Sequence, residues 1–254
     1  QGLERHETIG GVRVFREPVI GRKDLQTASI ISMLSYPLAA IRRAVTLRRE
    51  ADYDIIHTHF AIPTGPAGYL LSKWWRKPNV VSVYGGDIYD PSKKYSPHRH
   101  PILKMAVKRV LNQASAVVAE SKDLQERTIS IYQPQHAPLR IPLGFKAPQF
   151  TGQDRVALGL EDDKVYAIAV SRLVSRKGYP DLLAALAKCN SPQLYLLIAG
   201  DGPEGPHLRQ LCAELGVQDR VRFLGQVTEE QKYQYLSNAD FFALATHHEG
   251  FGIV

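Results

Sequence analysis

The chain has 254 residues and a formal charge of +7, with 44% hydrophobic and 22% charged residues. These are the values of a folded globular protein, so they exclude intrinsic disorder as a description of the whole chain. Cys189 and Cys212 are the two cysteines, which excludes a disulfide framework and favours a reducing, cytoplasmic setting. No apolar run approaches the ~20 residues of a transmembrane helix. The chain begins with neither a start methionine nor the apolar stretch of a signal peptide.

The positive charge is concentrated in the first part of the chain. Residues 1–150 carry 22 basic and 12 acidic side chains, whereas residues 151–254 carry 10 and 13. A basic region joined to a mildly acidic one indicates two domains with different partners. Nucleic acid, an anionic membrane surface and a phosphorylated substrate are the candidate partners of the basic region.

Short apolar runs alternate with longer segments of helical period along the chain. In chain order the pattern predicts an inner strand over Gly11–Pro18, a helix over 27–50, then strands over Asp54–Thr58, Val80–Tyr84, Ser115–Ala119, Val165–Ser171, Leu194–Ala199, Arg220–Leu224 and Asp240–Ala245, with helices near 65–76, 100–112, 121–132, 178–189, 204–216 and 228–238 between them. This alternation predicts an α/β fold with parallel sheets built from βαβ units.

A proline-rich stretch interrupts the alternation near residues 138–153. It contains three prolines and a glycine between Ala137 and Phe150, and no helix crosses such a segment. The charge balance changes sign at the same place. We therefore expect an interdomain linker at about 145–155 and two domains, over 1–148 and 149–254.

Two cations flank a predicted strand-to-helix connection in the second domain. The strand ends at Ser171, the helix begins near Pro180, and Arg172 and Lys177 lie between them. Free backbone N–H groups at such a connection favour anions. Arg172 could bind a diphosphate with its two-pronged guanidinium and Lys177 as a point charge. The alternative is that both are solvated loop cations.

A second loop carries the pattern G-x-G-x-x-G at Gly200, Gly202 and Gly205. It follows a predicted strand and opens a helix, as a dinucleotide site requires. However, about 20 residues further on the sequence reads Val221-Arg-Phe-Leu-Gly, where a ribose-binding acid is expected. We therefore favour a tight turn, or contact with another nucleotide, over a nicotinamide cofactor.

Two further loops follow buried strands at their carboxyl ends, where ligands bind in open α/β sheets. Glu249-Gly-Phe-Gly follows the last predicted strand, and its carboxylate can accept hydrogen bonds from sugar hydroxyls. The alternative is a turn with an aromatic anchor. In the first domain, Tyr84 and Asp87 occupy the same kind of edge.

The histidines do not indicate a metal site. We expect His57 and His59, two residues apart, to face opposite sides of their strand, which argues against joint ligation. His247 and His248 are adjacent and equally unsuited to chelate one ion. The prediction is that the protein has no metal site and no cofactor.

Six motifs occur in an order that resembles glycosyltransferase family 4, a branch of the GT-B fold. They are Asp54-Ile-Ile-His-Thr-His-Phe, Val83-Tyr-Gly-Gly-Asp, Arg172-Leu-Val-Ser-Arg-Lys-Gly, Ala199-Gly-Asp-Gly-Pro-Glu, Arg222-Phe-Leu-Gly and Glu249-Gly-Phe-Gly-Ile-Val. The resemblance covers the chain from about residue 50 and is strongest after residue 165.

The resemblance implies two Rossmann-like domains that face each other across a cleft, and a retaining, metal-independent transfer of sugar from a nucleoside diphosphate to an unknown acceptor. By similarity, Arg172 and Lys177 neutralise the donor diphosphate, and Glu249 binds the donor sugar. Glu249, Tyr84 and Asp87 are the expected catalytic residues. The other expected donor contacts are Gly202, Arg222, Phe223, Leu224, Gly250, Phe251, Gly252, Ile253 and Val254.

The sequence departs from the family pattern at three places. The second glutamate of the family's Glu-x7-Glu signature falls beyond the last residue, and the N-terminal glycine-rich loop is absent, so we expect both domains to be incomplete. The family's histidine before Gly-x-Asp is Tyr84 here. A phenol can hydrogen-bond a sugar hydroxyl, but it does not carry the positive charge of an imidazolium.

Three alternatives to an active transferase follow from these observations. The chain could bind nucleotide sugars without turnover, or be an NAD(P)-binding Rossmann protein, or bind nucleic acid, although no nucleic-acid motif is present. The basic excess also has a membrane interpretation, in which a basic face meets an anionic surface or a phosphate-bearing lipid acceptor. That face comprises Arg42, Arg43, Arg48 and Arg49, after the apolar Ile30, Ile31 and Leu34, together with Lys93, Lys94, His98, Arg99 and His100.

Overall fold

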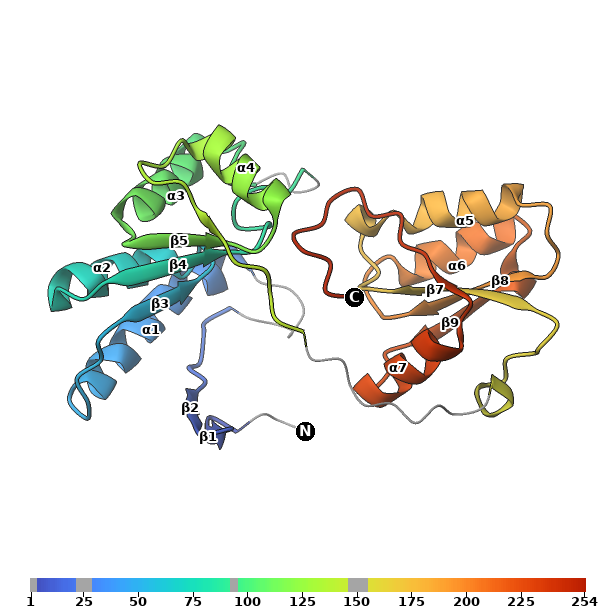
Figure 1. The fold of residues 1–254 in the computed structure, drawn as a ribbon, viewed down its shortest axis with the longest axis horizontal. Helices are drawn as coiled ribbons and strands as arrows, with labels where there is room; N and C mark the ends of the chain where they lie inside the picture. The colour runs from blue at the N-terminus through green and yellow to red at the C-terminus, as the bar shows by residue number, and fades with distance from the viewer. Residues whose placement is uncertain (1–3, 22–28, 92–95, 146–154) are drawn as a thin grey trace. The chain divides into compact units, whose positions relative to one another are not determined.

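The computed structural model describes residues 4–21, 29–91, 96–145 and 155–254 (Figure 1). The chain forms two compact units, residues 1–143 and residues 144–254, and each is described by itself. The expected domain boundary at residue 148 and most of the expected linker lie outside the described residues. None of the helices in the described ranges has the length and apolar character needed to span a membrane.

The first unit contains a parallel sheet with the strand order β3-β4-β5-β6. Its elements are β1 (His6–Ile9), β2 (Val12–Phe15), α1 (Ile30–Arg48), β3 (Ile56–His59), α2 (Gly65–Trp75), β4 (Asn79–Val83), α3 (Pro101–Gln113), β5 (Ala116–Ala119), α4 (Lys122–Tyr132) and β6 (Leu139–Arg140). The expected strands and helices from residue 54 onward appear with ends shifted by one or two residues. The two-residue strand β6 lies in the proline-rich stretch and is additional.

The core of the first unit lies on one face of this sheet. Val81 and Val117 pack there against Val107 and Leu111 of α3, and the core also contains Leu124 of α4. Alternate strand residues point to opposite faces, so the residues between these valines, such as Val80, lie on the other face.

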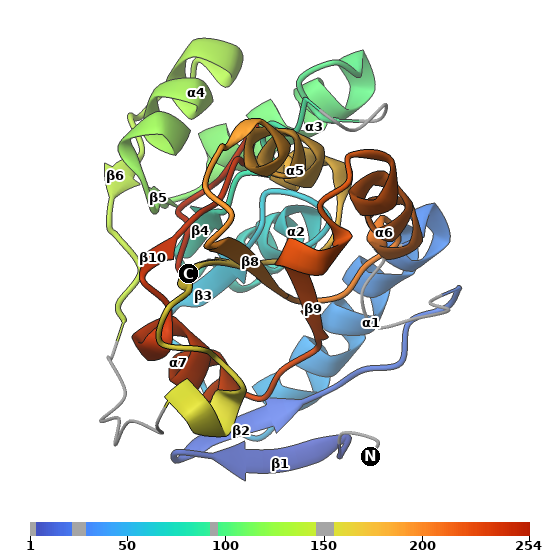
Figure 2. The same cartoon turned by 90° about the vertical axis from the view of Figure 1, so that its right-hand side faces the viewer.

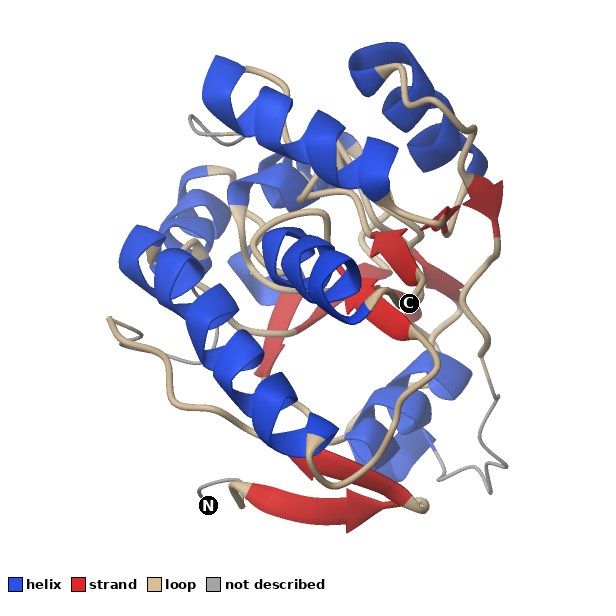
Figure 3. Ribbon diagram, turned by 90° about the vertical axis from the view of Figure 1, so that its left-hand side faces the viewer, coloured by secondary structure: helices blue, strands red, loops and turns tan. Residues whose placement is uncertain are grey.

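The prediction of an inner strand over Gly11–Pro18 is wrong. Strand β2 pairs antiparallel with β1 in a separate two-stranded sheet, with Ile9 opposite Val12. Gly10 and Gly11 form the two-residue turn with φ of 55° and 83°. Positive φ at both turn positions is the geometry that lets two antiparallel strands keep their twist. Within the first unit, the hairpin lies apart from the strands of the parallel sheet (Figure 3).

The second unit contains a parallel sheet with the order β10-β7-β8-β9. Its elements are β7 (Val165–Val170), α5 (Tyr179–Lys188), β8 (Leu194–Ala199), α6 (Gly205–Glu214), β9 (Val221–Gly225), α7 (Glu229–Asn238) and β10 (Phe241–Phe242). Short 3-10 turns span Arg155–Leu158, Ser175–Lys177 and Gln218–Arg220.

Successive residues of β7 enter two different cores, as expected for a strand that is covered on both faces. Ala167 and Ala169 pack with residues of α5 and α6. Tyr166 and Ile168 pack with residues of α7. The sheet therefore lies between α5 and α6 on one side and α7 on the other, as Figures 1 and 2 show.

The last strand is shorter than predicted. Strand β10 covers only Phe241–Phe242, rather than Asp240–Ala245. Beyond β10 the chain leaves the sheet, and the carbonyl of Ala245 packs directly on Gly178, where a Cβ atom would collide with it. This departure carries the segment after β10 to the loop that follows β7.

Candidate active site

The loops after β7 and β10 meet at the carboxyl edge of the second sheet. There the Lys177 ammonium donates to Oε2 of Glu249 and forms an ion pair. Lys177 is only 8% exposed, and its position is fixed by the 3-10 turn, where its N–H donates to the carbonyl of Val174 at 2.9 Å. The two residues that sequence similarity assigns to diphosphate and sugar are therefore in contact.

Backbone hydrogen bonds hold these two loops together. The N–H of His247 donates to the carbonyl of Arg176 at 2.9 Å, and the Thr246 hydroxyl donates to the same carbonyl at 3.2 Å. Arg176 in turn donates to the carbonyl of His248 at 3.3 Å. The ring of His247 also contacts Asp181 on α5, with 2.7 Å between Nε2 and Oδ2. The position of Glu249 is thus set by the loop that carries Lys177.

Arg172 lies on the same loop as Lys177, directly after β7, and it is exposed. Its carbonyl accepts from the N–H of Val174 at 2.9 Å, while its guanidinium is open to solvent. The edge therefore combines one exposed cation with one buried cation. This is an arrangement suited to an anionic group that docks from solvent.

The glycine-rich loop packs against this segment. A Cβ atom on Gly200 would collide with the carbonyl of Ser171, and one on Gly202 with the carbonyl of Leu173. Gly200 has φ of 138°, which favours glycine. The glycines are therefore explained by close approach of two backbones, the tight-turn interpretation. Gly202 donates its N–H to the side chain of Asp201 at 2.7 Å, so its expected donor contact remains a prediction.

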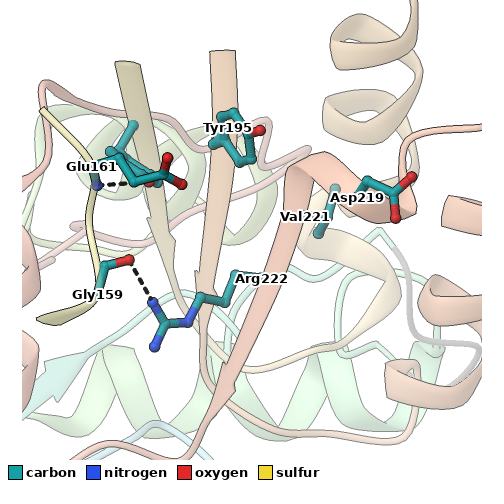
Figure 4. A pocket seen from close by; sticks show the side chains of 7 residues that line it. Gly159, Glu161, Tyr195, Asp219, Val221 and Arg222 are labelled. Atoms are coloured by element: carbon teal, nitrogen blue, oxygen red, sulfur yellow. Dashed lines mark hydrogen bonds between the residues drawn. The ribbon is translucent and has the colours of Figure 1, made fainter. Parts of the chain in front are cut away.

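The side chain of Arg222, which we expect to contact the base, is hydrogen-bonded within its own unit, and its contact with the donor stays a prediction. Its Nη1 donates to the carbonyls of Leu158 and Gly159, at 2.9 and 3.4 Å, in the segment that precedes β7 (Figure 4). It lines a cavity of about 190 Å³ with Tyr166 and Tyr195, which lie near the start of β7 and β8. The Arg222 guanidinium is therefore held toward the amino-terminal ends of the strands, away from Lys177.

The neighbours of Arg222 face the two cores of the second unit. Phe223 packs partly in the core beneath α5 and α6, and the Arg209 guanidinium lies 4.3 Å from the centre of its ring. Leu224 packs partly in the core beneath α7. Both residues are only half-buried, and their expected contacts with the base stay predictions.

The last five residues follow Glu249 as an exposed segment. Phe251, Gly252, Ile253 and Val254 are exposed, and Gly250 is half-buried. Gly252 has φ of 76°, and a Cβ atom there would lie 3.3 Å from Cγ of Glu249. Glycine thus keeps this segment close to the Glu249 side chain, and its expected contacts with a donor stay predictions.

A second polar edge occurs in the first unit, at the carboxyl ends of β3 and β4. Nδ1 of His59 lies 2.5 Å from the hydroxyl of Tyr84, and Nε2 of His57 lies 2.8 Å from the hydroxyl of Ser82. The expectation that His57 and His59 face opposite sides of the strand is wrong. Residues two apart share a face, and the two ring centres lie 4.3 Å apart. Burial, followed by the neighbouring His57, lowers the pKa of His59.

Asp87, one of the expected catalytic residues, is buried and connects two loops, and its catalytic role stays a prediction. It is 5% exposed, and its two oxygens accept from the N–H of Ala61 at 2.7 Å and of Tyr84 at 3.0 Å. It therefore joins the loop after β3 to the loop after β4. Burial raises the pKa of Asp87 to about 6, so a charge placed there is costly.

Sequence reasoning did not select His59 and Phe60 as site residues. Phe60 follows β3, is 43% exposed, and has φ of 74°. Its ring centre lies 4.9 Å from that of Tyr84. Positive φ at a bulky residue is unusual and has no signature in the sequence. The alternation of His57 and His59 with a threonine was the available signal that both rings lie on one face.

Across the described residues, no group of three or more His, Cys, Asp or Glu side chains is placed to hold a metal ion. Charge at the edge of the second sheet comes instead from Arg172, Lys177 and Glu249. These side chains suit recognition of a group with both phosphate oxygens and hydroxyls.

Two successive Rossmann-like units, each with polar loops at the carboxyl edge of a parallel sheet, place the protein in the GT-B class of glycosyltransferase folds. The chain belongs to glycosyltransferase family 4. The family model "Glycosyltransferase Family 4" matches residues 8–144, and the model "Glycosyl transferases group 1" matches residues 151–254.

Known proteins of similar sequence and fold agree with this assignment. The glycosyltransferase TuaC of Bacillus subtilis is 32% identical over 210 residues, which is 80% of this chain and 50% of that protein. Sucrose-phosphate synthase of Thermosynechococcus elongatus superposes with a TM-score of 0.82 at 23% identity, over 98% of this chain and 64% of that one. HepE of Anabaena, solved with UDP and glucose, gives a TM-score of 0.69 at 27% identity, over 85% and 59%. The chain spans about half the length of the curated relatives it matches.

Proposed function

We propose that the protein is a retaining glycosyltransferase that moves a sugar from a nucleoside diphosphate sugar to an acceptor. The observation that carries the proposal is the ion pair between the buried Lys177 and the half-buried Glu249, beside the exposed Arg172. A nucleoside diphosphate sugar presents phosphate oxygens next to sugar hydroxyls, and this pair offers a cation and a carboxylate side by side. HepE, a structure of the same fold, has been solved with UDP-glucose, which supports the donor class.

The charges at this edge fit the chemistry of the transfer. The bond between the anomeric carbon and the phosphate oxygen breaks, the acceptor oxygen bonds to that carbon, and the acceptor proton passes to the departing diphosphate. Negative charge develops on the diphosphate, and cations that are already in position next to it stabilise the transition state. Arg172 and Lys177 supply this charge, so the proposal needs no metal ion. Glu249 accepts from sugar hydroxyls and orients the donor.

Calorimetric titration with UDP tests the donor site. We expect Lys177→Ala and Arg172→Ala each to weaken the binding of UDP about ten-fold or more, because each removes a charge-assisted contact worth about 1.5–3 kcal/mol. Lys188→Ala is the matched control, since Lys188 is an exposed cation at the far end of α5, and its affinity should equal that of the wild type. Equal affinity of all four proteins would refute the donor site.

Turnover is measured separately from binding. Incubation with UDP-glucose and detection of released UDP reports transfer to water or to an added acceptor. If the wild-type protein releases UDP and Lys177→Ala does not, the result supports the proposal that the protein is an enzyme. UDP binding without any release would instead favour a nucleotide-sugar-binding module, the alternative that the sequence leaves open.

We also propose that α1 holds the protein at the anionic inner face of a membrane. Ile31, Leu34 and Leu38 are 61, 70 and 71% exposed, and their spacing places them on one face of the helix. The exposed Arg42 continues this face. Apolar side chains followed by a cation fit an interface of acyl chains and lipid phosphates. Lys93 and Lys94 lie outside the described residues.

Sedimentation with lipid vesicles tests the membrane proposal. Vesicles of phosphatidylglycerol should bind the wild-type protein better than vesicles of phosphatidylcholine, and Leu34→Glu should reduce that binding. Ile102→Glu is a matched control, because Ile102 is an equally exposed residue on α3 (66%). Equal sedimentation with both lipids would exclude the proposal.

A further inference from the structure

The carboxyl edge of the first sheet carries a cluster of rings that the donor chemistry does not use. It consists of His57, His59, Phe60 and Tyr84. Its members come from the ends of two neighbouring strands, because His59 lies opposite Ser82 in the sheet register, two residues before Tyr84. The four rings form one continuous series of contacts. The ring centres lie 4.3 Å apart for His57 and His59, 5.8 Å for His59 and Tyr84, and 4.9 Å for Phe60 and Tyr84.

Phe60 is held in an unfavourable backbone conformation with its ring partly open to solvent. Its φ of 74° is fixed from both sides, because its N–H donates to the carbonyl of Ser82 at 2.8 Å and its carbonyl accepts from the Thr64 hydroxyl at 2.7 Å. A left-handed conformation is unfavourable for a bulky residue. It persists only where the surrounding structure enforces it, and residues of this kind cluster at functional sites. Here the result is a phenyl ring that is 43% exposed and lies beside Tyr84.

The Tyr84 hydroxyl is oriented by two independent sets of contacts. The buried Asp87 fixes the backbone through the Tyr84 N–H at 3.0 Å, and His59 bonds the hydroxyl through Nδ1 at 2.5 Å. The His59 ring is in turn packed on His57, which bonds Ser82 at 2.8 Å. A phenol and an imidazole held in this way offer a donor and an acceptor of fixed direction beside a flat apolar ring.

The charge around this cluster argues against a phosphorylated ligand. Among the residues that the structure describes, the charged groups that act on the Tyr84 hydroxyl are the carboxylates of Glu120 and Asp87. Carboxylates repel phosphate oxygens but accept from hydroxyls. A neutral ligand that combines hydroxyl groups with an apolar face matches the ring, the two hydrogen-bonding groups and the local charge together. A sugar ring has this combination, since its C–H groups line one face and its hydroxyls the rim.

We propose that Phe60, Tyr84 and His59 form a subsite for the sugar ring of the glycosyl acceptor, with Phe60 stacked on the ring and the Tyr84–His59 pair bonded to one of its hydroxyls. The acceptor is thereby assigned to the carbohydrates. This inference rests on the proposed function, and it adds the class of acceptor to it. It also gives Tyr84 a role that a phenol performs without a positive charge.

Saturation-transfer NMR with simple glycosides tests the subsite on the whole chain. The probes are the methyl glycosides of glucose, galactose, mannose and N-acetylglucosamine. We expect at least one to bind the wild-type protein, and Phe60→Ala to weaken it about five-fold or more through loss of one aromatic contact. Tyr84→Phe, which removes only the hydroxyl, should weaken it by a similar factor, and so should His59→Gln, which replaces the imidazole with an amide. Trp74→Ala is the control, because Trp74 is an exposed aromatic of the same unit (65%) outside the cluster.

Failure of the subsite and failure of the donor site give different results. If no glycoside binds, or if binding survives both Phe60→Ala and Tyr84→Phe, the subsite is wrong, whatever UDP does. If Lys177→Ala removes UDP binding and leaves glycoside binding intact, the two sites are separate, as we expect. A fall in UDP-glucose affinity with Phe60→Ala and Tyr84→Phe would show that the ring belongs to the donor and overturn the acceptor assignment. Unchanged unfolding midpoints, followed by fluorescence of Trp74 and Trp75 in α2, show that the variants fold.

Discussion

In the first unit the carboxyl ends of β3 and β4 carry imidazole and phenol groups, whereas in the second unit the ends of β7 and β10 lead to Lys177 and Glu249. Both edges occupy the same place in a parallel sheet, where loops are free to vary. Their side chains differ in charge, and so do the two ligands that we propose for them. Cations suit a diphosphate, and neutral rings with directed hydrogen bonds suit a sugar.

The two edges are also held in place by different means. In the second unit, glycines allow backbones to touch, as at Gly200 against Ser171 and at Gly178 against Ala245. In the first unit, one buried carboxylate, Asp87, binds the N–H groups of two loops. We call the edge with Lys177 and Glu249 the charged edge, and the edge with His59 and Tyr84 the neutral edge. Steric fit between backbones therefore positions the charged edge, and a buried carboxylate positions the neutral edge. Each mechanism can be removed by a single substitution.

The largest effect is expected from Gly200→Ala. The new Cβ atom would collide with the carbonyl of Ser171, and φ of 138° disfavours any side chain. We expect the second unit to lose about 3–5 kcal/mol of unfolding free energy, measured by denaturant titration with circular dichroism. Both tryptophans lie in α2 of the first unit, so the fluorescence transition should not move.

Gly216→Ala is the matched control for this substitution. Gly216 has φ of 67°, also in the left-handed region, but nothing lies within 4 Å of its Cβ position. Gly216→Ala should therefore lower the unfolding free energy by only about 1–2 kcal/mol, the penalty for placing a side chain in the left-handed conformation. Equal losses for the two variants would show that close packing does not position the charged edge.

The second prediction concerns Asp87→Asn and pH. Because burial raises the pKa of Asp87 from 3.8 to about 6, the folded state binds the proton more tightly than the unfolded state. The stabilisation from this group is fully present below about pH 4 and is lost as pH rises through about 6. The wild-type advantage over Asp87→Asn should therefore be about 2 kcal/mol near pH 5 and smaller at pH 7.5.

Tryptophan fluorescence measures this prediction, since it reports the first unit. Urea titrations of both proteins at several pH values between 4.5 and 8 give the difference directly. A difference that stays constant across this range, or that grows with pH, would contradict the raised pKa.

The sequence predicted the two sheets and the charged edge more fully than the neutral edge. Apolar runs of strand length and helical periods report burial directly, so the order of elements from β3 to α7 was accessible. Lys177 and Glu249 were found because each lies in a motif. The Gly10–Gly11 hairpin was missed although two adjacent glycines are typical of such turns.

Contacts between neighbouring strands could not be predicted in this way. His59 and Tyr84 are 25 residues apart in the chain, and their hydrogen bond depends on sheet register. Arg222 was assigned to the donor from its motif, yet its guanidinium points back to Gly159. A motif gives the position of a residue in the chain, whereas the direction of a strand side chain depends on what packs around it.

The third prediction separates Arg222 from the charged edge. Because its guanidinium bonds the carbonyls of Leu158 and Gly159, Arg222→Met should lower the stability of the second unit by about 1–2 kcal/mol. The affinity for UDP should not change, in contrast to Lys177→Ala. Circular dichroism and calorimetry on one preparation measure both. Weaker UDP binding with unchanged stability would instead support the contact between Arg222 and the donor that the sequence predicts.

The smallest effects are expected at two helix caps, one in each unit. The Ser121 hydroxyl accepts from the N–H of Leu124 at 3.2 Å at the start of α4. The Thr228 hydroxyl accepts from the N–H of Gln231 at 3.1 Å at the start of α7. Replacing either cap by alanine leaves one N–H unsatisfied and should cost about 1 kcal/mol.

The loss of stability at the two caps should appear in different signals, tryptophan fluorescence for one and circular dichroism for the other. Ser121→Ala should shift the fluorescence transition, because the tryptophans lie in its unit, and Thr228→Ala should shift only the transition seen by circular dichroism. Separate shifts would mean that the charged and neutral edges belong to units that unfold independently. If either variant moves both transitions equally, the units unfold together, and a substitution at one edge then also changes the stability of the other.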